Sequence, residues 1–232
     1  IREFKRRNLI FECKVRPNVG VAMSSLWITY ADIVTSGKYE FMCYFHDKKS
    51  PYSNFLMQGE QFATRCYENL MGSTAVVKNI INLLIDNPRM GIVGSPQPYN
   101  GEYFDVCQRS WRGNFENTIE LAKKLGIKVN IDENIVPVTA YGDMFWFRTD
   151  ALKDAISYGF TYNDFDIKYQ KDNTILHAIE RIYGYAAQNS GYYYADVVNS
   201  DEARTDLVNY KNMLDTYSKI LLKNGEWPAT FE

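Results

Sequence analysis

The chain has 232 residues, of which 26 are basic and 28 acidic, so its formal net charge is −2. This length can bury the core of one large domain. The nearly balanced charge provides no general attraction to nucleic acid, so we expect no nucleic-acid partner. No stretch approaches the ~18 consecutive apolar residues of a membrane span, so we expect no transmembrane segment.

The four cysteines, Cys13, Cys43, Cys66 and Cys107, lie far apart and form no CxxC pair. They predict buried free thiols in a reducing compartment, and hence a cytoplasmic protein that can work at the inner face of the membrane. The sequence begins with Ile1 and shows no signal-peptide pattern, so we expect a piece of a longer protein.

The first part of the chain predicts a strand, a helix and a second strand. Residues 7–15 carry β-favouring side chains and end at the turn-forming Pro-Asn-Val-Gly of 17–20. Apolar residues recur every three or four positions across 22–35, which predicts an amphipathic helix. The apolar run 39–45 predicts an inner strand that is covered on both faces. Together these elements predict a crossover unit.

The rest of the chain alternates further helices with short strands. Helical spacing covers 60–71, 74–85, 114–125, a brief segment from Ala151, 173–187 and a long terminal stretch at 201–223. Strands are predicted at 90–93, 141–148 and 192–198, with a long irregular segment at 94–112. The alternation predicts an α/β layered fold. We expect a single domain over 1–232.

The predicted strand at 39–45 ends in the polar cluster His46, Asp47, Lys48, Lys49 and Ser50. Ligand sites in open α/β sheets lie at the carboxyl ends of strands. The aspartate could ligate a divalent metal, the lysines could neutralise a diphosphate, and the serine could donate a hydrogen bond to an oxyanion. The alternative is a solvated, charged exit from a strand, and spacing alone does not decide between them.

The second of the two histidines, His177, lies in the predicted helix 173–187. His177, Glu180 and Arg181 share one face of that helix. A neutral imidazole could complete a metal or phosphate site, whereas a glutamate beside an arginine favours a structural ion pair. Because histidines are so scarce, we expect His46 and His177 to converge on one pyrophosphate pocket.

Residues 142–146, Gly-Asp-Met-Phe-Trp, place the carboxylate of Asp143 just before a hydrophobic strand. There it could accept a proton from an acceptor hydroxyl, or it could cap a turn. The sequence contains no GxSxG elbow, GxGxxG fingerprint, P-loop, HExxH or EF-hand loop. This disfavours serine hydrolases, dinucleotide oxidoreductases and nucleoside triphosphatases.

Six segments occur in a set order along most of the chain, from about residue 9 to about residue 198. They are Pro-Asn-Val-Gly at 17–20, the strand and polar cluster at 39–50, Glu-Asn-Leu-Met-Gly-Ser at 68–73, Asn-Pro-Arg-Met-Gly-Ile-Val at 87–93, Gly-Asp-Met-Phe-Trp-Phe-Arg at 142–148 and His-Ala-Ile-Glu-Arg at 177–181. In this order they resemble the rhamnan synthesis protein F family of bacterial glycosyltransferase-like proteins. The ordered combination is far more specific than any one motif.

The resemblance implies a GT-A-like fold, in which a Rossmann-related sheet is flanked by helices, here without its first strand and helix. It also implies transfer of a sugar from a nucleotide-diphosphate donor, with rhamnose from dTDP-rhamnose as the expected case. The acceptor would be a growing cell-wall or surface polysaccharide or a lipid-linked glycan, and the cofactor a divalent metal, Mn²⁺ or Mg²⁺.

The resemblance also implies roles for particular residues. The donor would be bound by Asn18, Gly20, His46, Lys48, Lys49, Ser50 and His177. The metal would be held by Asp47 and His177, and the acceptor would be approached by Met144, Phe145 and Trp146.

For the catalytic base, the position of Asp143 in this chain favours it over Glu180. Relatives usually carry a small residue at the position of Asp143, so the resemblance does not supply this assignment. The family also tends to continue with Arg-Asp after the Asn-x-Gly motif, where this chain has Val21 and Ala22. That departure favours an alternative, a catalytically inactive module that binds glycans or scaffolds a polysaccharide-synthesis complex. A phosphate-handling hydrolase is a third class, but the chain lacks a second acid cluster for two metals.

Overall fold

The computed structural model describes residues 5–8, 10–47, 56–96, 111, 113–165 and 173–224. The chain divides into two compact units, Ile1–Asp196 and Val197–Glu232. The first unit contains the sheet, and the second contains one long helix. That both belong to one glycosyltransferase domain stays a prediction.

The described elements of the first unit alternate between helices and strands. They begin with the π-helical turn η1 (Ser25–Thr29), α2 (Ala31–Thr35), β1 (Phe41–Tyr44), α3 (Leu56–Met71) and α4 (Thr74–Asp86). They continue with β2 (Met90–Gly94), α5 (Phe115–Lys124), β3 (Phe145–Arg148), α6 (Thr149–Ile156), the 3₁₀ turn η3 (Tyr162–Phe165), α7 (Ile175–Asn189) and β4 (Tyr193–Asp196). From residue 60 onward, the helices and strands predicted by spacing are confirmed, with shifted ends.

The four described strands form one mixed sheet in the order β1-β3-β2-β4. β3 runs antiparallel to β1 and β2, whereas β2 and β4 are parallel. Strands β1, β2 and β4 therefore end at the same end of the sheet, where β3 begins, and we call this the carboxyl end of the sheet. The register aligns Tyr44, Phe145, Gly94 and Asp196 across it. The α/β class is confirmed, and a GT-A-like fold stays a prediction.

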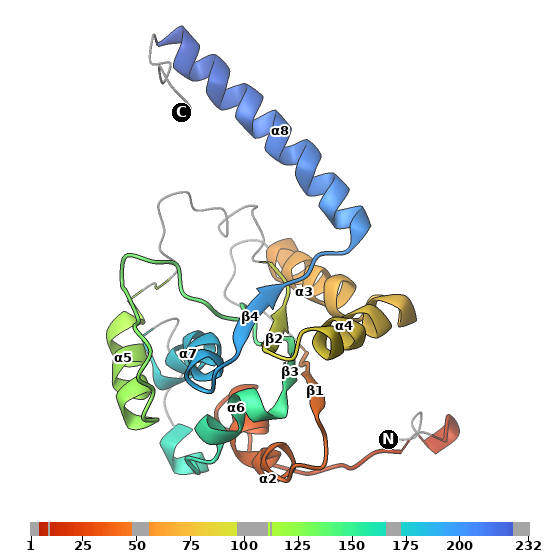
Figure 1. Cartoon of the computed structure of the whole chain (residues 1–232), viewed down its shortest axis with the longest axis vertical. Coiled ribbons are helices and arrows are strands. Elements are labelled where there is room, and N and C mark those ends of the chain that lie inside the picture. The colour runs from red at the N-terminus through yellow and green to blue at the C-terminus, as the bar shows by residue number, and fades with distance from the viewer. Residues whose placement is uncertain are drawn as a thin grey trace. The chain divides into compact units, whose positions relative to one another are not determined.

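Helices cover both faces of the sheet (Figure 1). In this view α3 and α4 lie on one side of the strands, and α5 and α7 lie on the other. Side chains of successive residues in β3 point to opposite faces of the sheet, as the two-residue period of a strand requires. Trp146 Nε1 donates a hydrogen bond to the Leu70 carbonyl of α3 at 2.9 Å, while the ring of Phe145 lies 4.7 Å from that of Tyr183 in α7.

The described residues 10–17 form no strand, so the predicted strand over 7–15 and its crossover unit are wrong. Ile10 and Val15 are 105% and 96% exposed. β-favouring side chains stabilise a strand through neighbours on the same sheet, and none of the four described strands pairs with this segment.

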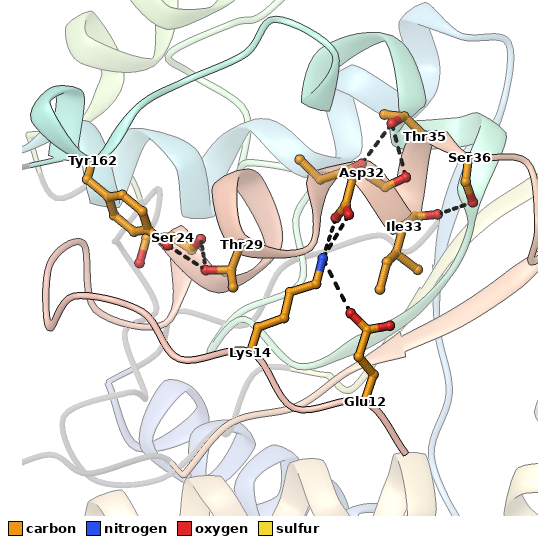
Figure 2. A network of polar contacts seen from close by, with 10 residues as sticks. Glu12, Lys14, Ser24, Thr29, Asp32, Ile33, Thr35, Ser36 and Tyr162 are labelled. Atoms are coloured by element: carbon orange, nitrogen blue, oxygen red, sulfur yellow. Dashed lines mark hydrogen bonds and ion pairs between the residues drawn. The ribbon is translucent and has the colours of Figure 1, made fainter. Parts of the chain in front are cut away.

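Polar contacts hold this extended segment to the helical region that follows (Figure 2). Lys14 Nζ lies 2.7 Å from Asp32 Oδ1 and 3.6 Å from Glu12 Oε1. Farther along, the hydroxyl oxygens of Thr29 and Tyr162 are 2.9 Å apart and join η1 to η3. In place of a strand ladder, the ion pair between Lys14 and Asp32 joins this segment to α2.

The predicted helix over 22–35 is present in two parts, η1 and α2, which meet at Tyr30. The amide of Tyr30 donates to the Ser25 carbonyl at 2.9 Å, the five-residue step of a π turn. Leu26 and Trp27 from this turn are buried in the core. Single π turns are rare and frequently occur near functional sites.

β1 is an edge strand, which corrects the prediction of an inner strand covered on both faces. Cys43 is exposed, and only Tyr44 of its residues is buried. The side chain of Phe41 instead lies under the guanidinium of Arg148, 4.7 Å from ring centroid to Cζ. A continuous apolar run therefore did not distinguish an edge strand from a central one. Cys13 is also exposed, so of the described cysteines only Cys66 fits the predicted burial.

The second unit contains α8 (Ser200–Lys223), which confirms the predicted terminal helix. The side chain of Asn199 caps it by accepting hydrogen bonds from the amides of Asp201 and Glu202. None of the helices within the described ranges is long and apolar enough to cross a bilayer.

Candidate functional site

Three separate segments meet at the carboxyl end of the sheet through polar side chains and a backbone amide and carbonyl. His46 follows β1, Gly142 precedes β3, and Glu180 belongs to α7. Nε2 of His46 lies 2.9 Å from the carbonyl oxygen of Gly142. The amide of Gly142 donates to Glu180 Oε1 at 3.1 Å. The backbone of one residue therefore joins the end of β1 to α7.

The turn that begins β3 has an unusual backbone. Gly142 and Asp143 have φ values of +84° and +55°, so two adjacent residues hold the left-handed conformation. For a residue with a Cβ this conformation costs roughly 1–2 kcal/mol. A Cβ at position 142 would lie 2.9 Å from the ring of Phe62, so the turn is also closely packed. Strained backbone concentrates at functional sites, which supports a function here.

The carboxyl group of Asp143 lies among buried tyrosines and a buried arginine. Asp143 is only 4% exposed. Burial raises the pKa of both Tyr44 and Tyr183 well above the ordinary value, and the negative charge of Asp143 raises each further. Burial alone would lower the pKa of Arg181, but the charges of Glu180 and Asp143 raise it. The guanidinium therefore stays charged beside the two carboxylates.

Both carboxylate oxygens of Glu180 contact neighbouring protein groups. Its Oε2 lies 2.9 Å from Arg181 Nη1, and the two side chains are 17% and 6% exposed. Its other oxygen accepts the hydrogen bond from Gly142. Both carboxylate oxygens therefore have structural partners, and this geometry fits a positioning role better than that of a base.

A loop from the N-terminal segment approaches the same end of the sheet. The guanidinium of Arg16 donates to the carbonyl oxygens of Val19 and Val21 at 3.1 and 2.7 Å. The hydroxyl of Tyr44, in the last residue of β1, donates to the carbonyl of Ala22. The hydrogen bond therefore holds the loop against Tyr44, which lies two residues before His46.

The predicted donor residues Asn18 and Gly20 belong to this loop. Gly20 and Val21 have φ values of +72° and +48°, a second pair of left-handed residues, and such a φ is an outlier for a β-branched residue. A Cβ at position 20 would lie 2.8 Å from the ring of Phe165. The loop is therefore both strained and tightly packed beside η3.

The predicted cluster after β1 is described only in part. His46 is half-buried and Asp47 is exposed. Lys48, Lys49 and Ser50 lie outside the described residues. Their predicted contacts with a diphosphate stay predictions.

His177 lies one turn before Glu180 on α7, and the two share a face. Its Nδ1 is 2.8 Å from Thr174 Oγ1 at the start of the helix. The imidazole of His177 belongs to α7 itself, and that of His46 is linked to α7 through the backbone of Gly142 and the carboxylate of Glu180. A pyrophosphate pocket shared by the two stays a prediction.

The three residues predicted to approach an acceptor differ in exposure. Met144 and Phe145 are fully buried in the core, whereas Trp146 is half-buried against α3. The first two directly follow the turn at Gly142 and Asp143 and are part of the buried core. Their contact with an acceptor stays a prediction.

Sequence reasoning missed polar residues that follow β2 and end β4. Asn69 Nδ2 donates to Ser95 Oγ at 3.0 Å, and both residues are buried. In β4, the Tyr194 hydroxyl donates to a carboxylate oxygen of Asp196. Asp196 is exposed as a residue, but burial around its carboxyl group still raises its pKa. Ser95 follows a predicted strand and Asp196 lies within one, but the strand pairing that places Gly94 beside Asp196 was not visible in the sequence.

A protein-built metal centre is not evident in the described ranges, where no three His, Cys, Asp or Glu side chains gather. Mg²⁺ is often held by one or two carboxylates together with substrate phosphates, without a protein cage. The exposed Asp47, just beyond β1, suits that mode of binding. The divalent metal stays a prediction.

One of the comparisons with known proteins identifies a family for the chain. The family model for rhamnan synthesis protein F matches residues 3–192. The chain has no significant match among curated proteins or among solved structures. The matched region includes His46, Asp143 and Glu180, together with the loop that carries Gly20. The chain therefore belongs to the rhamnan synthesis protein F family.

Proposed function

We propose that the chain is a glycosyltransferase that moves rhamnose, or another deoxyhexose, from a dTDP-linked donor to a growing surface polysaccharide. Its family is named for rhamnan synthesis, which supports a role in making such a polymer. The observation that carries the proposal is the meeting of His46, the turn at Gly142 and α7 at the carboxyl end of the sheet. Ligands of α/β sheets bind at that end.

The polar cluster after β1 supplies groups that a departing nucleoside diphosphate requires. Negative charge develops on the leaving oxygen, and cations and hydrogen-bond donors fixed nearby lower the barrier. Lys48, Lys49 and Ser50 are the residues of this chain proposed for that role. A divalent ion bound through Asp47 would neutralise further charge on the diphosphate.

Asp143 is the proposed general base for the acceptor hydroxyl. The hydrogen bonds that Gly142 makes with His46 and Glu180 fix the backbone beside it. Glu180 is the weaker candidate because both of its carboxylate oxygens are engaged with protein groups. A base must lie within hydrogen-bond reach of the proton that it removes, and the strained turn sets where the Asp143 carboxylate lies.

Donor binding is tested by thermal denaturation with a panel of nucleotide sugars and Mn²⁺ or Mg²⁺. A ligand that binds only the folded chain raises the melting temperature, so we expect a rise with dTDP-rhamnose. Asp47→Ala should remove this rise. Asp86→Ala is the matched control, because Asp86 ends α4 just before β2 begins and so lies away from the carboxyl end of the sheet. An equal rise in both variants would contradict the assigned site.

The rival is a catalytically inactive module that binds glycans or scaffolds a synthesis complex. It is favoured by Val21 and Ala22, which stand where relatives tend to carry Arg-Asp. The carbonyl groups of both residues are already engaged by Arg16 and Tyr44. No shift with any nucleotide sugar in the panel would support this rival over the transferase.

A further inference from the structure

The long helix α8 carries an apolar stripe at heptad spacing. Its members are Leu207, Tyr210, Leu214, Tyr217 and Leu221, which follow one another at alternating intervals of three and four residues. We call this stripe the α8 seam. No side chain of α8 is buried, and Leu207 and Leu214 are 67% and 66% exposed. This spacing is that of the a and d positions through which one helix packs along another.

The charges on α8 do not favour a lipid surface as the partner of the seam. The acids are Asp201, Glu202, Asp206 and Asp215, and the bases are Arg204, Lys211, Lys219 and Lys223. The two sets are equal in number, whereas a helix that lies on an anionic membrane is typically rich in Lys and Arg on its polar face. Another helix is the better-matched partner.

The charged residues beside the α8 seam indicate which helix pairs with α8 and whether the two helices run parallel or antiparallel. With leucines at a and tyrosines at d, Asp206 takes a g position and Lys211 the e position of the next heptad. In a parallel pair, g of one helix lies beside the following e of the other, so acid meets base twice by symmetry. In an antiparallel pair, g faces g and e faces e, and this match is lost.

We propose that α8 pairs with α8 of a second copy of the chain in a parallel two-stranded coiled coil. The α8 seam forms its core, and Asp206 of each copy lies beside Lys211 of the other. The family match ends at residue 192, before α8 begins, so this pairing does not depend on the proposed transferase activity. Because the α8 seam from Leu207 to Leu221 spans only about two heptads, the dimer forms reversibly and depends on concentration.

Sedimentation equilibrium of the full chain over a series of concentrations tests the pairing. The wild type should show a reversible monomer–dimer equilibrium. Leu214→Glu places a charge in the seam and should weaken dimerisation at least about tenfold, because an unpaired charge is costly to bury. Thr216→Glu, on the opposite side of α8, adds the same charge outside the seam and should leave the equilibrium unchanged.

A charge swap tests the parallel direction. Asp206→Lys and Lys211→Asp should each weaken the dimer about threefold to tenfold, since each creates two like-charge contacts, and the double variant should restore it. A monomer at every concentration, a dimer unaffected by Leu214→Glu, or a double variant that is not restored would each overturn the proposal. Binding of the chain to phosphatidylglycerol vesicles that Leu214→Glu abolishes would also overturn it, in favour of a membrane surface.

Discussion

At the scale of single residues, the candidate site depends on the backbone of Gly142. Its carbonyl oxygen lies within hydrogen-bond distance of His46, and its amide donates to Glu180. Both Gly142 and the next residue, Asp143, have a left-handed φ. His46 and Asp143 could be chosen from the sequence, because one follows and the other precedes a predicted strand. Gly142 could not, because both of its contacts are made across long sequence separations.

The buried tyrosines beside Asp143 predict a stability change at alkaline pH. Trp27 Nε1 donates to the Tyr183 hydroxyl at 3.0 Å, so Tyr183→Phe should cost about 1–3 kcal/mol near pH 7. The pKa of Tyr183 is raised by burial and by Asp143, so above about pH 10 this tyrosine ionises in the unfolded chain before it does so in the folded one. The wild type then loses stability that the variant does not lose.

Urea unfolding from pH 7 to pH 11 measures this difference. The gap between the wild type and Tyr183→Phe should narrow as the pH rises past 10. Tyr158→Phe changes an exposed tyrosine and should follow the wild type closely. A gap that stays constant to pH 11 would show that Tyr183 ionises normally.

At the scale of elements, local signals predicted helices better than they predicted the sheet. Helix α4 follows from its apolar spacing and from Ser73, whose hydroxyl accepts a hydrogen bond from the Val76 amide. The strand at 7–15 failed and β1 lies at an edge, because a strand's stability comes from partners that are distant in sequence. The resemblance assigned Asn18 and Gly20 of the N-terminal loop to the donor, but the contacts with Arg16 and Tyr44 that hold this loop could not be foreseen, for the same reason.

The turn into β3 provides a prediction at this scale. Gly142→Ala adds a Cβ in a left-handed conformation and 2.9 Å from the buried ring of Phe62, whereas Gly126→Ala adds one at φ +69° with open space around it. We expect the Gly126 variant to lose about 1 kcal/mol and the Gly142 variant at least about 1 kcal/mol more. Chemical denaturation of both variants measures the two losses. Equal losses would mean that the turn is not tightly packed.

At the scale of the whole molecule, the two units have separate proposed tasks. The first unit holds the sheet, the candidate site and the whole of the family match, residues 3–192. The second unit offers an exposed helix with a seam for self-association. The sequence predicted both the α/β class and the terminal helix from periodicity. It could not separate the two units, because no linker composition marks the boundary after Asp196.

The activity proposed for the first unit is transfer of a sugar from a nucleotide donor at the carboxyl end of the sheet. The most direct test measures acceptor-dependent release of dTDP from dTDP-rhamnose by the wild type and by Asp143→Asn. The wild type should release dTDP, and the variant should do so about 10²–10⁴-fold more slowly while its melting temperature still rises with donor. Equal turnover by the two proteins, or no turnover by the wild type with any donor and acceptor, would contradict this proposed activity.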